Sequence, residues 1–221
     1  LKNVISVVGT NSKYSMIKSF QSILNQAGYK CNLYTSPHLQ SYTERYVYDD
    51  KEIDEDNLAD LLEDIEKING SDNLSEFEAL TCAYLKYCEQ YKDNITFMEA
   101  GLFHRMDSTN IFKNNLCSLL GSVSIDHLSW LENKSIDGII HEKTTKLLTS
   151  KVFINKQENK ETTLKIKDAL KDNKSEKYFY GDDFNYLTAE NNFIQYEDDK
   201  GGIILPEPNI LGQHQLANIS T

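Results

Sequence analysis

Short apolar runs along the chain alternate with stretches whose apolar residues recur every three or four positions. Val4–Val8 is rich in β-branched residues and ends at Gly9, a pattern typical of a buried parallel strand. The next stretch, Ser15–Ala27, has apolar residues at helical spacing and ends at Gly28, a residue that often follows a helix. The chain is therefore predicted to begin with a strand, a loop and a helix.

The same alternation continues through the middle of the chain. Strands are predicted at Cys31–Thr35, Ile95–Met98, Leu116–Ile125 and Lys151–Ile154, and helices at Glu55–Ile68, Glu76–Tyr91, Ser135–Leu148 and Glu161–Lys171. Strands that alternate with helices in this way form a mostly parallel sheet with helices on both faces. We therefore predict an α/β fold with a sheet of the type that carries phosphate-binding loops.

The pattern changes from Tyr178 onward. Short runs separated by turn residues predict an antiparallel β meander at one edge of the sheet. The runs are Tyr186–Thr188, Phe193–Tyr196 and Ile203–Leu205, and the turns are Asn191-Asn192 and Gly201-Gly202. The last segment, Gly212–Asn218, has the pattern of the opening of a helix. Because the sequence has no internal repeat and no low-complexity linker, we assign residues 1–221 to one domain.

Composition and charge exclude several classes of function. The chain is 39% hydrophobic, but its apolar runs are far shorter than the roughly 18 to 20 residues that span a bilayer. With 34 acidic and 23 basic residues and a net charge of −11, it lacks the basic surface of a general nucleic-acid-binding protein. The four cysteines lack metal-ligand spacing, so we expect free thiols in the cytoplasm.

The junction between the first strand and the first helix carries candidate phosphate-binding chemistry. Its residues are Gly9, Thr10, Asn11, Ser12, Lys13, Tyr14 and Ser15. Backbone N–H groups at a helix N-terminus favour phosphate, Lys13 could meet a phosphate as a point charge, and the Ser15 hydroxyl could bind Mg²⁺. On these residues alone, an ordinary polar turn without a ligand is the alternative.

A second group of candidate residues follows the later strands. Glu99 and His127 each come just after a predicted strand, and Lys143 lies on the next helix. Ligands of doubly wound sheets bind beyond the carboxyl ends of the strands, so these side chains are expected to converge on one crevice. An ammonium has no lone pair, so the set suits a metal only if Lys143 is chemically modified. A surface Glu, a half-buried His and a solvated Lys are the alternative.

The order of the motifs along the chain resembles the folylpolyglutamate synthase/dihydrofolate synthase family, part of the Mur-ligase superfamily. The matching segments are Gly9–Ser15, Tyr34–Leu39 with Glu44-Arg45, Met98–Leu102 with Arg105–Asn110, Ile125–His127, Glu142-Lys143 and Gly212–Asn218. The family uses ATP to activate a pteroate or folate carboxylate as an acyl phosphate and joins it to the amine of L-glutamate. The resemblance implies ATP, Mg²⁺, dihydropteroate or folate, and glutamate as ligands, and a monomer.

The resemblance also implies roles for individual residues. Gly9–Ser15 would hold the triphosphate, with Lys13 on the phosphates, and Ser15, Ser36 and Glu99 would bind the first magnesium ion. His127 would bind a second magnesium ion together with Lys143, which is carbamylated in this family. A carbamate is an oxygen-donating anion, which removes the difficulty of a lysine ligand. Asn218 matches the position near adenine, and Thr35–Arg45 would lie at the folate pocket.

Several motif positions depart from the family. The family loop reads Gly-Thr-Asn-Gly-Lys-Gly-Ser, whereas this chain has Ser12 and Tyr14 at the two later glycines, so weaker nucleotide binding is expected. Phe103 and His104 stand in the family's Gly-Leu-Gly-Gly-Arg segment, and Thr144 follows Lys143. By comparison with the family, the chain is the central ATP-binding domain, and the glutamate-ligase domain lies outside it. A catalytically silent remnant of the family and a weak nucleotide- or folate-binding module are the alternative functions.

Overall fold

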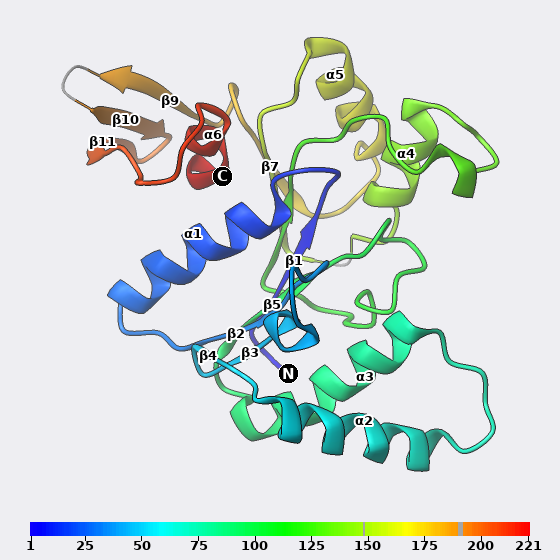
Figure 1. Ribbon diagram of the computed structural model, residues 1–221. Helices are drawn as coiled ribbons and strands as arrows, with labels where there is room; N and C mark the ends of the chain where they lie inside the picture. The colour runs from blue at the N-terminus through cyan, green and yellow to red at the C-terminus, as the bar shows by residue number, and fades with distance from the viewer. Residues whose placement is uncertain (148, 190–191) are drawn as a thin grey trace.

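The computed structural model describes residues 1–147, 149–189 and 192–221. Its main sheet has eight strands in the order β4-β3-β2-β5-β1-β6-β7-β8 (Figure 1). Their bounds are β1 Val4–Val8, β2 Cys31–Tyr34, β3 Tyr46–Tyr48, β4 Lys51–Glu52, β5 Ile95–Glu99, β6 Cys117–Leu120, β7 Lys151–Ile154 and β8 Glu176–Phe179. The neighbouring strands β2, β5, β1, β6, β7 and β8 pair in parallel. Beyond β2, the strands β3 and β4 add an antiparallel edge. The predicted α/β fold is confirmed.

Helices cover both faces of this sheet. Their bounds are α1 Lys13–Gln26, α2 Glu55–Asn69, α3 Glu76–Cys88, α4 Ile136–Thr144, α5 Lys160–Ala169 and α6 His214–Ser220. Side chains of β1 alternate between the faces: Ile5 and Val7 pack in the cluster that includes α1, whereas Val4 packs with α2 and α3 and Val8 with α4 and α5. Burial on both faces explains the continuous β-branched run of β1.

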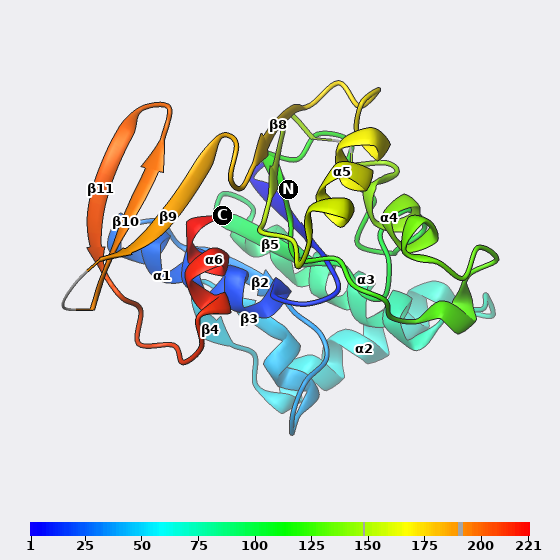
Figure 2. The ribbon, with the colours of Figure 1, turned by 90° about the horizontal axis from the view of Figure 1, so that it is seen from above.

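The antiparallel meander forms a sheet of its own. Its strands are β9 Phe184–Ala189, β10 Phe193–Asp198 and β11 Gly201–Pro206, in the order β11-β10-β9. Figure 2 shows it projecting beside α6, away from the main sheet. The predicted meander is confirmed, but its predicted place at the edge of the main sheet is wrong. Of the predicted turns, Asn191 lies outside the described residues.

A tight turn separates the two sheets. The edge position next to β7 is taken by β8, which the sequence pattern did not identify. After β8, Gly181 has a φ of 88°, and the Asp183 carboxylate accepts a hydrogen bond from the Phe179 N–H. This turn redirects the chain before β9 begins, so β9 starts a new sheet instead of extending the first.

β6 and α4 end earlier than their hydrophobic patterns predicted. β6 ends at Leu120, because Ser122 turns its carbonyl to the N–H groups of Thr10 and Asn11 and ties the two loops together. α4 ends at Thr144, and Leu148 lies outside the described residues. Within the described ranges, no helix is long and apolar enough to cross a membrane.

Candidate functional site

The loop between β1 and α1 lies at the carboxyl ends of the central strands. Ser12 is the N-cap residue of α1 and adopts a left-handed conformation with a φ of 72°. Its side chain makes no capping hydrogen bond, unlike the N-cap residues Asp54, Ser75 and Ser135. The N–H groups in the first turn of α1 therefore lack a side-chain acceptor from the N-cap, which is the arrangement that suits an anion.

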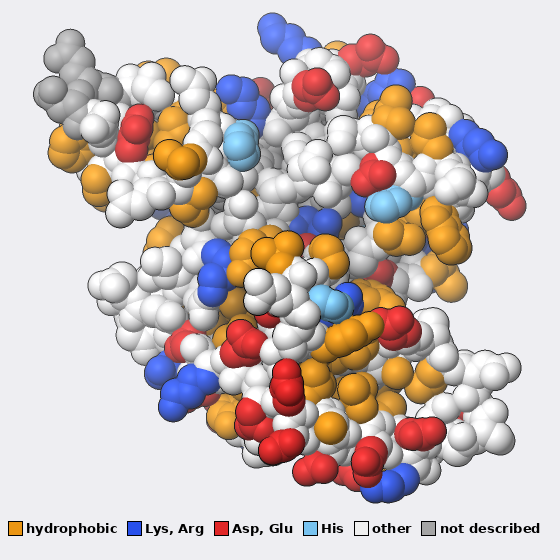
Figure 3. Space-filling model, in the orientation of Figure 1, with side chains coloured by type: hydrophobic (Ala, Val, Ile, Leu, Met, Phe, Trp, Pro, Cys, Tyr) orange, Lys and Arg blue, Asp and Glu red, His pale blue; other side chains and the backbone are white. Residues whose placement is uncertain are grey.

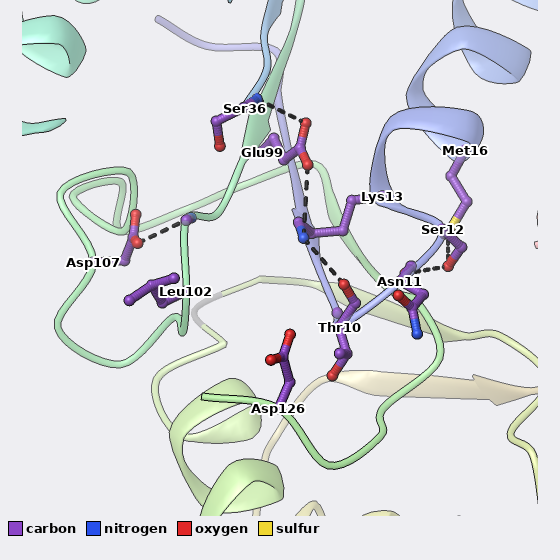
Figure 4. Close-up of polar contacts among 12 residues, drawn as sticks. Thr10, Asn11, Ser12, Lys13, Met16, Ser36, Glu99, Leu102, Asp107 and Asp126 are labelled. Atoms are coloured by element: carbon purple, nitrogen blue, oxygen red, sulfur yellow. Dashed lines mark hydrogen bonds and ion pairs between the residues drawn. The ribbon is translucent and has the colours of Figure 1, made fainter. Parts of the chain in front are cut away.

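The Ser12 side chain packs into the protein. Figure 4 shows it beside Met16, on the opposite side of the loop from Glu99. The Ser122 N–H donates to Ser12 Oγ at 3.4 Å, and a Cβ on Gly121 would lie 2.5 Å from the same oxygen. A serine fits here because Gly121 leaves room for it. Tyr14, at the other departure from the family loop, is exposed.

Lys13 and Glu99 meet beneath this loop (Figure 4). Lys13 Nζ lies 3.7 Å from Glu99 Oε1, and it donates to the Thr10 carbonyl at 3.5 Å. The Ser36 N–H donates to Glu99 Oε2 at 3.1 Å. Glu99 is only 2% exposed, and burial raises the pKa of its carboxyl to about 7, although the Lys13 charge opposes the shift. The site thus holds a buried carboxyl next to a lysine that can move onto a ligand.

Lys143 reaches the same loop from α4. It is 3% exposed, and its Nζ donates to the carbonyls of Gly9 at 2.9 Å and Leu102 at 2.8 Å. Burial, followed by the charge of Lys13, lowers the pKa of Lys143 to about 7. The expectation that Lys143 faces the loop therefore agrees with the geometry, and its amine acts here as a hydrogen-bond donor.

His127 lies next to Lys143 across an aromatic ring. The Phe103 ring is 6.4 Å from the His127 ring and 5.5 Å from Lys143 Nζ, measured from the ring centre. His127 Nε2 lies 3.2 Å from the Asp126 carboxylate. The structure thus joins Lys13 to Glu99 and Lys143 to Gly9 by direct contacts. His127 makes no such contact with these residues among those described, and it shares only the neighbour Phe103 with Lys143.

A pocket of about 720 Å³ adjoins the loop. Ser12 and Ser15 line one side of it, and Asn218 of α6 lines the other. Asn218 Oδ1 accepts from Asn155 Nδ2 at 2.9 Å, and Asn218 Nδ2 donates to Gln215 at 2.9 Å. The predicted Asn218 therefore lies at the pocket, with its amide engaged in anchoring α6.

Sequence reasoning missed some residues that line the pocket. Asn155 follows β7 directly, so its place after a strand could have marked it. Lys156 and Tyr186 also line the pocket, and Lys156 Nζ lies 5.7 Å from the centre of the Tyr186 ring. Tyr186 comes from the second sheet, whose position relative to the loop could not be inferred from local patterns.

Other motif residues are structural. Asp107 accepts hydrogen bonds from the Gly101 and Thr109 N–H groups and shapes the loop after β5. Arg105 Nε makes a two-pronged contact to both carboxylate oxygens of Glu142, at 2.9 and 3.0 Å. These contacts hold the segment that follows Glu99 against α4.

The donor set suits a hard divalent cation that brings other ligands with it. Within the described ranges, no group of three or more His, Cys, Asp or Glu side chains could hold a metal ion. Glu99 and the hydroxyls of Ser15 and Ser36 are oxygen donors, and Mg²⁺ usually takes one or two carboxylates and completes its shell with water and phosphate oxygens. These residue types therefore suit a hard divalent cation that brings phosphate oxygens with it.

Comparisons with known proteins give consistent relatives. The chain is 36% identical over 128 residues to the dihydrofolate synthase/folylpolyglutamate synthase of Escherichia coli K12, covering 58% of this chain and 30% of the relative. It is 33% identical over 134 residues to the dihydrofolate synthetase of Saccharomyces cerevisiae, covering 59% and 31%. No family model matches the chain.

Solved structures share the fold along nearly the whole chain. The structure of E. coli FolC in complex with DHPP and ADP has a TM-score of 0.86 and 29% identity, and the match covers 98% of this chain and 51% of FolC. The bifunctional folylpolyglutamate synthase/dihydrofolate synthase of Yersinia pestis, complexed with AMPPNP and Mn ion, has a TM-score of 0.85 and 25% identity. The chain thus spans about half the length of these solved relatives.

Proposed function

Since this chain belongs to the dihydrofolate synthase/folylpolyglutamate synthase family, we propose that it is the nucleotide-binding part of an ATP-dependent ligase. The reaction joins L-glutamate to dihydropteroate or a (tetrahydro)folate, with the pterin-linked carboxylate activated as an acyl phosphate. The relatives are named as synthases or synthetases, and none of the comparisons favours a catalytically silent remnant.

The meeting of Lys13 and Glu99 under the β1–α1 loop carries this proposal. Nζ and Oε1 are 3.7 Å apart, at the carboxyl ends of the strands and at the start of a helix whose N-cap makes no side-chain capping bond. A triphosphate on the loop would find helix N–H groups and a lysine together. The adjacent pocket of about 720 Å³ lies within the usual size range of small-molecule sites and can take the nucleoside.

We assign a divalent cation, Mg²⁺, to Ser15, Ser36 and Glu99. When bound, the cation neutralises charge on the phosphates during transfer. The chain's own residues position these groups. The Ser36 N–H holds Glu99 Oε2 at 3.1 Å, and Lys13 adds a positive charge, besides that of the cation, next to Glu99 Oε1. Phosphoryl transfer depends mostly on such positioning and charge stabilisation.

A second cation would lie between His127 and Lys143 if Lys143 is carbamylated. A carbamate forms when a neutral amine attacks carbon dioxide, so burial that lowers the Lys143 pKa to about 7 favours the reactive form near neutral pH. The modified side chain could keep at most one of its hydrogen bonds to the carbonyls of Gly9 and Leu102, since a carbamate nitrogen retains a single N–H and its oxygens only accept.

Glutamate incorporation tests the proposal. The complete reading frame that contains these residues is assayed with dihydropteroate or tetrahydrofolate, ATP, Mg²⁺ and labelled L-glutamate. We expect turnover that Lys13→Ala and Glu99→Gln each reduce at least a hundredfold, because each removes a charged contact to the phosphates or the cation. Lys2→Ala, which removes an exposed lysine away from the site, is the matched control.

Absence of ATP-dependent glutamate incorporation with every pterin substrate, from a protein that is folded, would reject the proposed activity. Equal turnover by Lys13→Ala and the wild type would reject the assigned site while leaving the activity.

A further inference from the structure

A basic pocket lies at the amino ends of the parallel strands, opposite the proposed nucleotide site. Its volume of about 540 Å³ lies within the usual range of small-ligand pockets. Lys113 and Asn115 precede β6, Lys146 precedes β7, and Lys174 precedes β8. We call it the lysine pocket, defined by Lys113, Lys146 and Lys174 with Asn115 at its wall. Strands four or five residues long separate it from the loop by roughly 15 Å.

The charge of the lysine pocket is opposite to that of the chain. The chain has a net charge of −11, yet the lining of this pocket, as far as the structure describes it, holds three lysines and no Asp or Glu. Across residues 1–147, 149–189 and 192–221, none of the three lysines makes an ion pair. Three uncompensated positive charges around one concavity attract a multiply charged anion.

Asn115 forms a fixed part of the pocket wall. It lines the pocket and is only 6% exposed. Its Nδ2 donates to Ser6 Oγ, and its Oδ1 is closed off from solvent. The side chain therefore shapes the pocket and leaves the three lysines as the groups that face a ligand.

The rim of the pocket is already ordered. Hydroxyl groups on it donate to backbone carbonyls: Ser150 Oγ to Leu116 at 2.7 Å, and Ser175 Oγ to Thr149 at 2.7 Å. Asn115 and Thr149 also form a parallel bridge. These bonds hold the strand ends together, so binding requires little further ordering of the backbone.

We propose that the lysine pocket is a second anion site that binds a phosphate group, inorganic or esterified. Lysine meets phosphate as a point charge, and a phosphate dianion matches the surplus positive charge of the three lysines. The site lies apart from the proposed nucleotide loop.

Calorimetry and thermal shift with inorganic phosphate test the proposal on the whole chain at constant ionic strength. The variant Lys113→Gln, Lys146→Gln, Lys174→Gln is expected to bind phosphate at least tenfold more weakly. The control Lys2→Gln, Lys92→Gln, Lys200→Gln makes the same charge change at exposed lysines that do not line this pocket, and it should bind within twofold of the wild type. Lys13→Ala removes the lysine of the nucleotide loop, so it distinguishes phosphate binding at that loop from binding in the lysine pocket. This variant should also keep a phosphate affinity within twofold of the wild type.

A titration with glycerol phosphate distinguishes inorganic from esterified phosphate as the ligand. A site that encloses the whole ion binds only inorganic phosphate, whereas a site that is open on one side binds both. The proposal is overturned if sodium chloride at the same ionic strength gives the same shift as phosphate, since the effect is then screening. It is equally overturned if Lys13→Ala abolishes phosphate binding while the lysine-pocket variant retains it.

Discussion

Ser12 combines an unfavourable backbone with a well-packed side chain. Its φ of 72° is a region where a Cβ costs about 1 to 2 kcal/mol per residue, and its hydroxyl is fitted against Gly121. From the sequence, the need for glycine at this position could be inferred from the family loop. The direction of the serine side chain could not, because it depends on the end of β6, more than a hundred residues later.

The first prediction compares two N-cap serines. Ser12→Gly is expected to raise the free energy of unfolding by about 1 kcal/mol, because glycine adopts the left-handed conformation without strain. Ser135→Gly is the matched control: its φ is −141° and its side chain caps α4, so the change should lower stability by a few tenths of a kcal/mol. Urea unfolding measures both. A Ser12→Gly protein less stable than the wild type would show that the hydroxyl contacts outweigh the strain.

The second prediction concerns His104, which is 1% exposed and has no hydrogen-bond partner for either ring nitrogen among the described residues. Burial, followed by the charge of Lys143, lowers the pKa of His104 to about 4. In the unfolded chain the imidazole titrates near 6.5, so below that pH the unfolded state binds a proton that the folded state does not. Stability therefore falls between pH 6.5 and pH 4, by on the order of 3 kcal/mol from this group.

Unfolding free energies of His104→Phe, measured from pH 7 to pH 4, are expected to fall less steeply than those of the wild type. His141→Phe, a change at an exposed histidine of α4, should keep the wild-type slope. Parallel curves for His104→Phe and the wild type would mean that His104 is not buried as a neutral ring.

At the scale of elements, the end of β6 determines the shape of the phosphate loop. A Cβ on Gly121 would lie 2.5 Å from Ser12 Oγ and 2.7 Å from the Asn11 carbonyl. Gly121→Ala is expected to displace the loop, lower stability by about 1 to 3 kcal/mol, and weaken nucleotide binding at least tenfold. Calorimetry with ADP and Mg²⁺ measures the affinity.

A double variant checks the cause of that loss. In Ser12→Gly, Gly121→Ala the clash with the hydroxyl is gone and only the contact to Asn11 remains, so part of the affinity should return. If the two changes are simply additive, Ser12 and Gly121 do not act on each other.

Element type was predictable where one strong pattern filled a segment, and unpredictable where pairing partners decided it. β1 and β7 follow from their β-branched runs. β8 begins Glu176-Lys177, and β4 is Lys51-Glu52, so neither has an apolar pattern, and both exist because a neighbouring strand offers hydrogen bonds. The separate second sheet depends on the turn at Gly181, which a strand pattern does not reveal.

At the scale of the whole molecule, the candidate site joins residues from strands that are distant in sequence. The rule that ligands lie beyond the carboxyl ends of parallel strands predicted that Glu99, His127 and Lys143 converge on one crevice. The structure adds the contacts of Glu99 with Lys13 and of Lys143 with Gly9, which the rule did not specify. The rule could have marked Asn155, which follows β7 directly, but it could not predict Tyr186, because that position depends on how the second sheet packs beside the loop.

A polypeptide of these 221 residues alone is expected to bind nucleotide without joining glutamate to a folate. The chain covers 51% of the length of FolC, and holding the two reactants in attack geometry is worth roughly 7 to 11 kcal/mol. The measurement is glutamate incorporation by the 221-residue polypeptide, with the complete reading frame as the control. Equal turnover by both would show that these residues contain the whole catalytic site.

Nucleotide binding by the β1–α1 loop is the central claim, and titration calorimetry with ATP and Mg²⁺ tests it most directly. The wild-type chain should bind one equivalent, Lys13→Ala should bind at least tenfold more weakly because a charged contact of about 1.5 to 3 kcal/mol is lost, and Lys2→Ala should match the wild type. Binding that is undetectable in the wild type, or equal in Lys13→Ala and the wild type, would contradict the assignment of this loop.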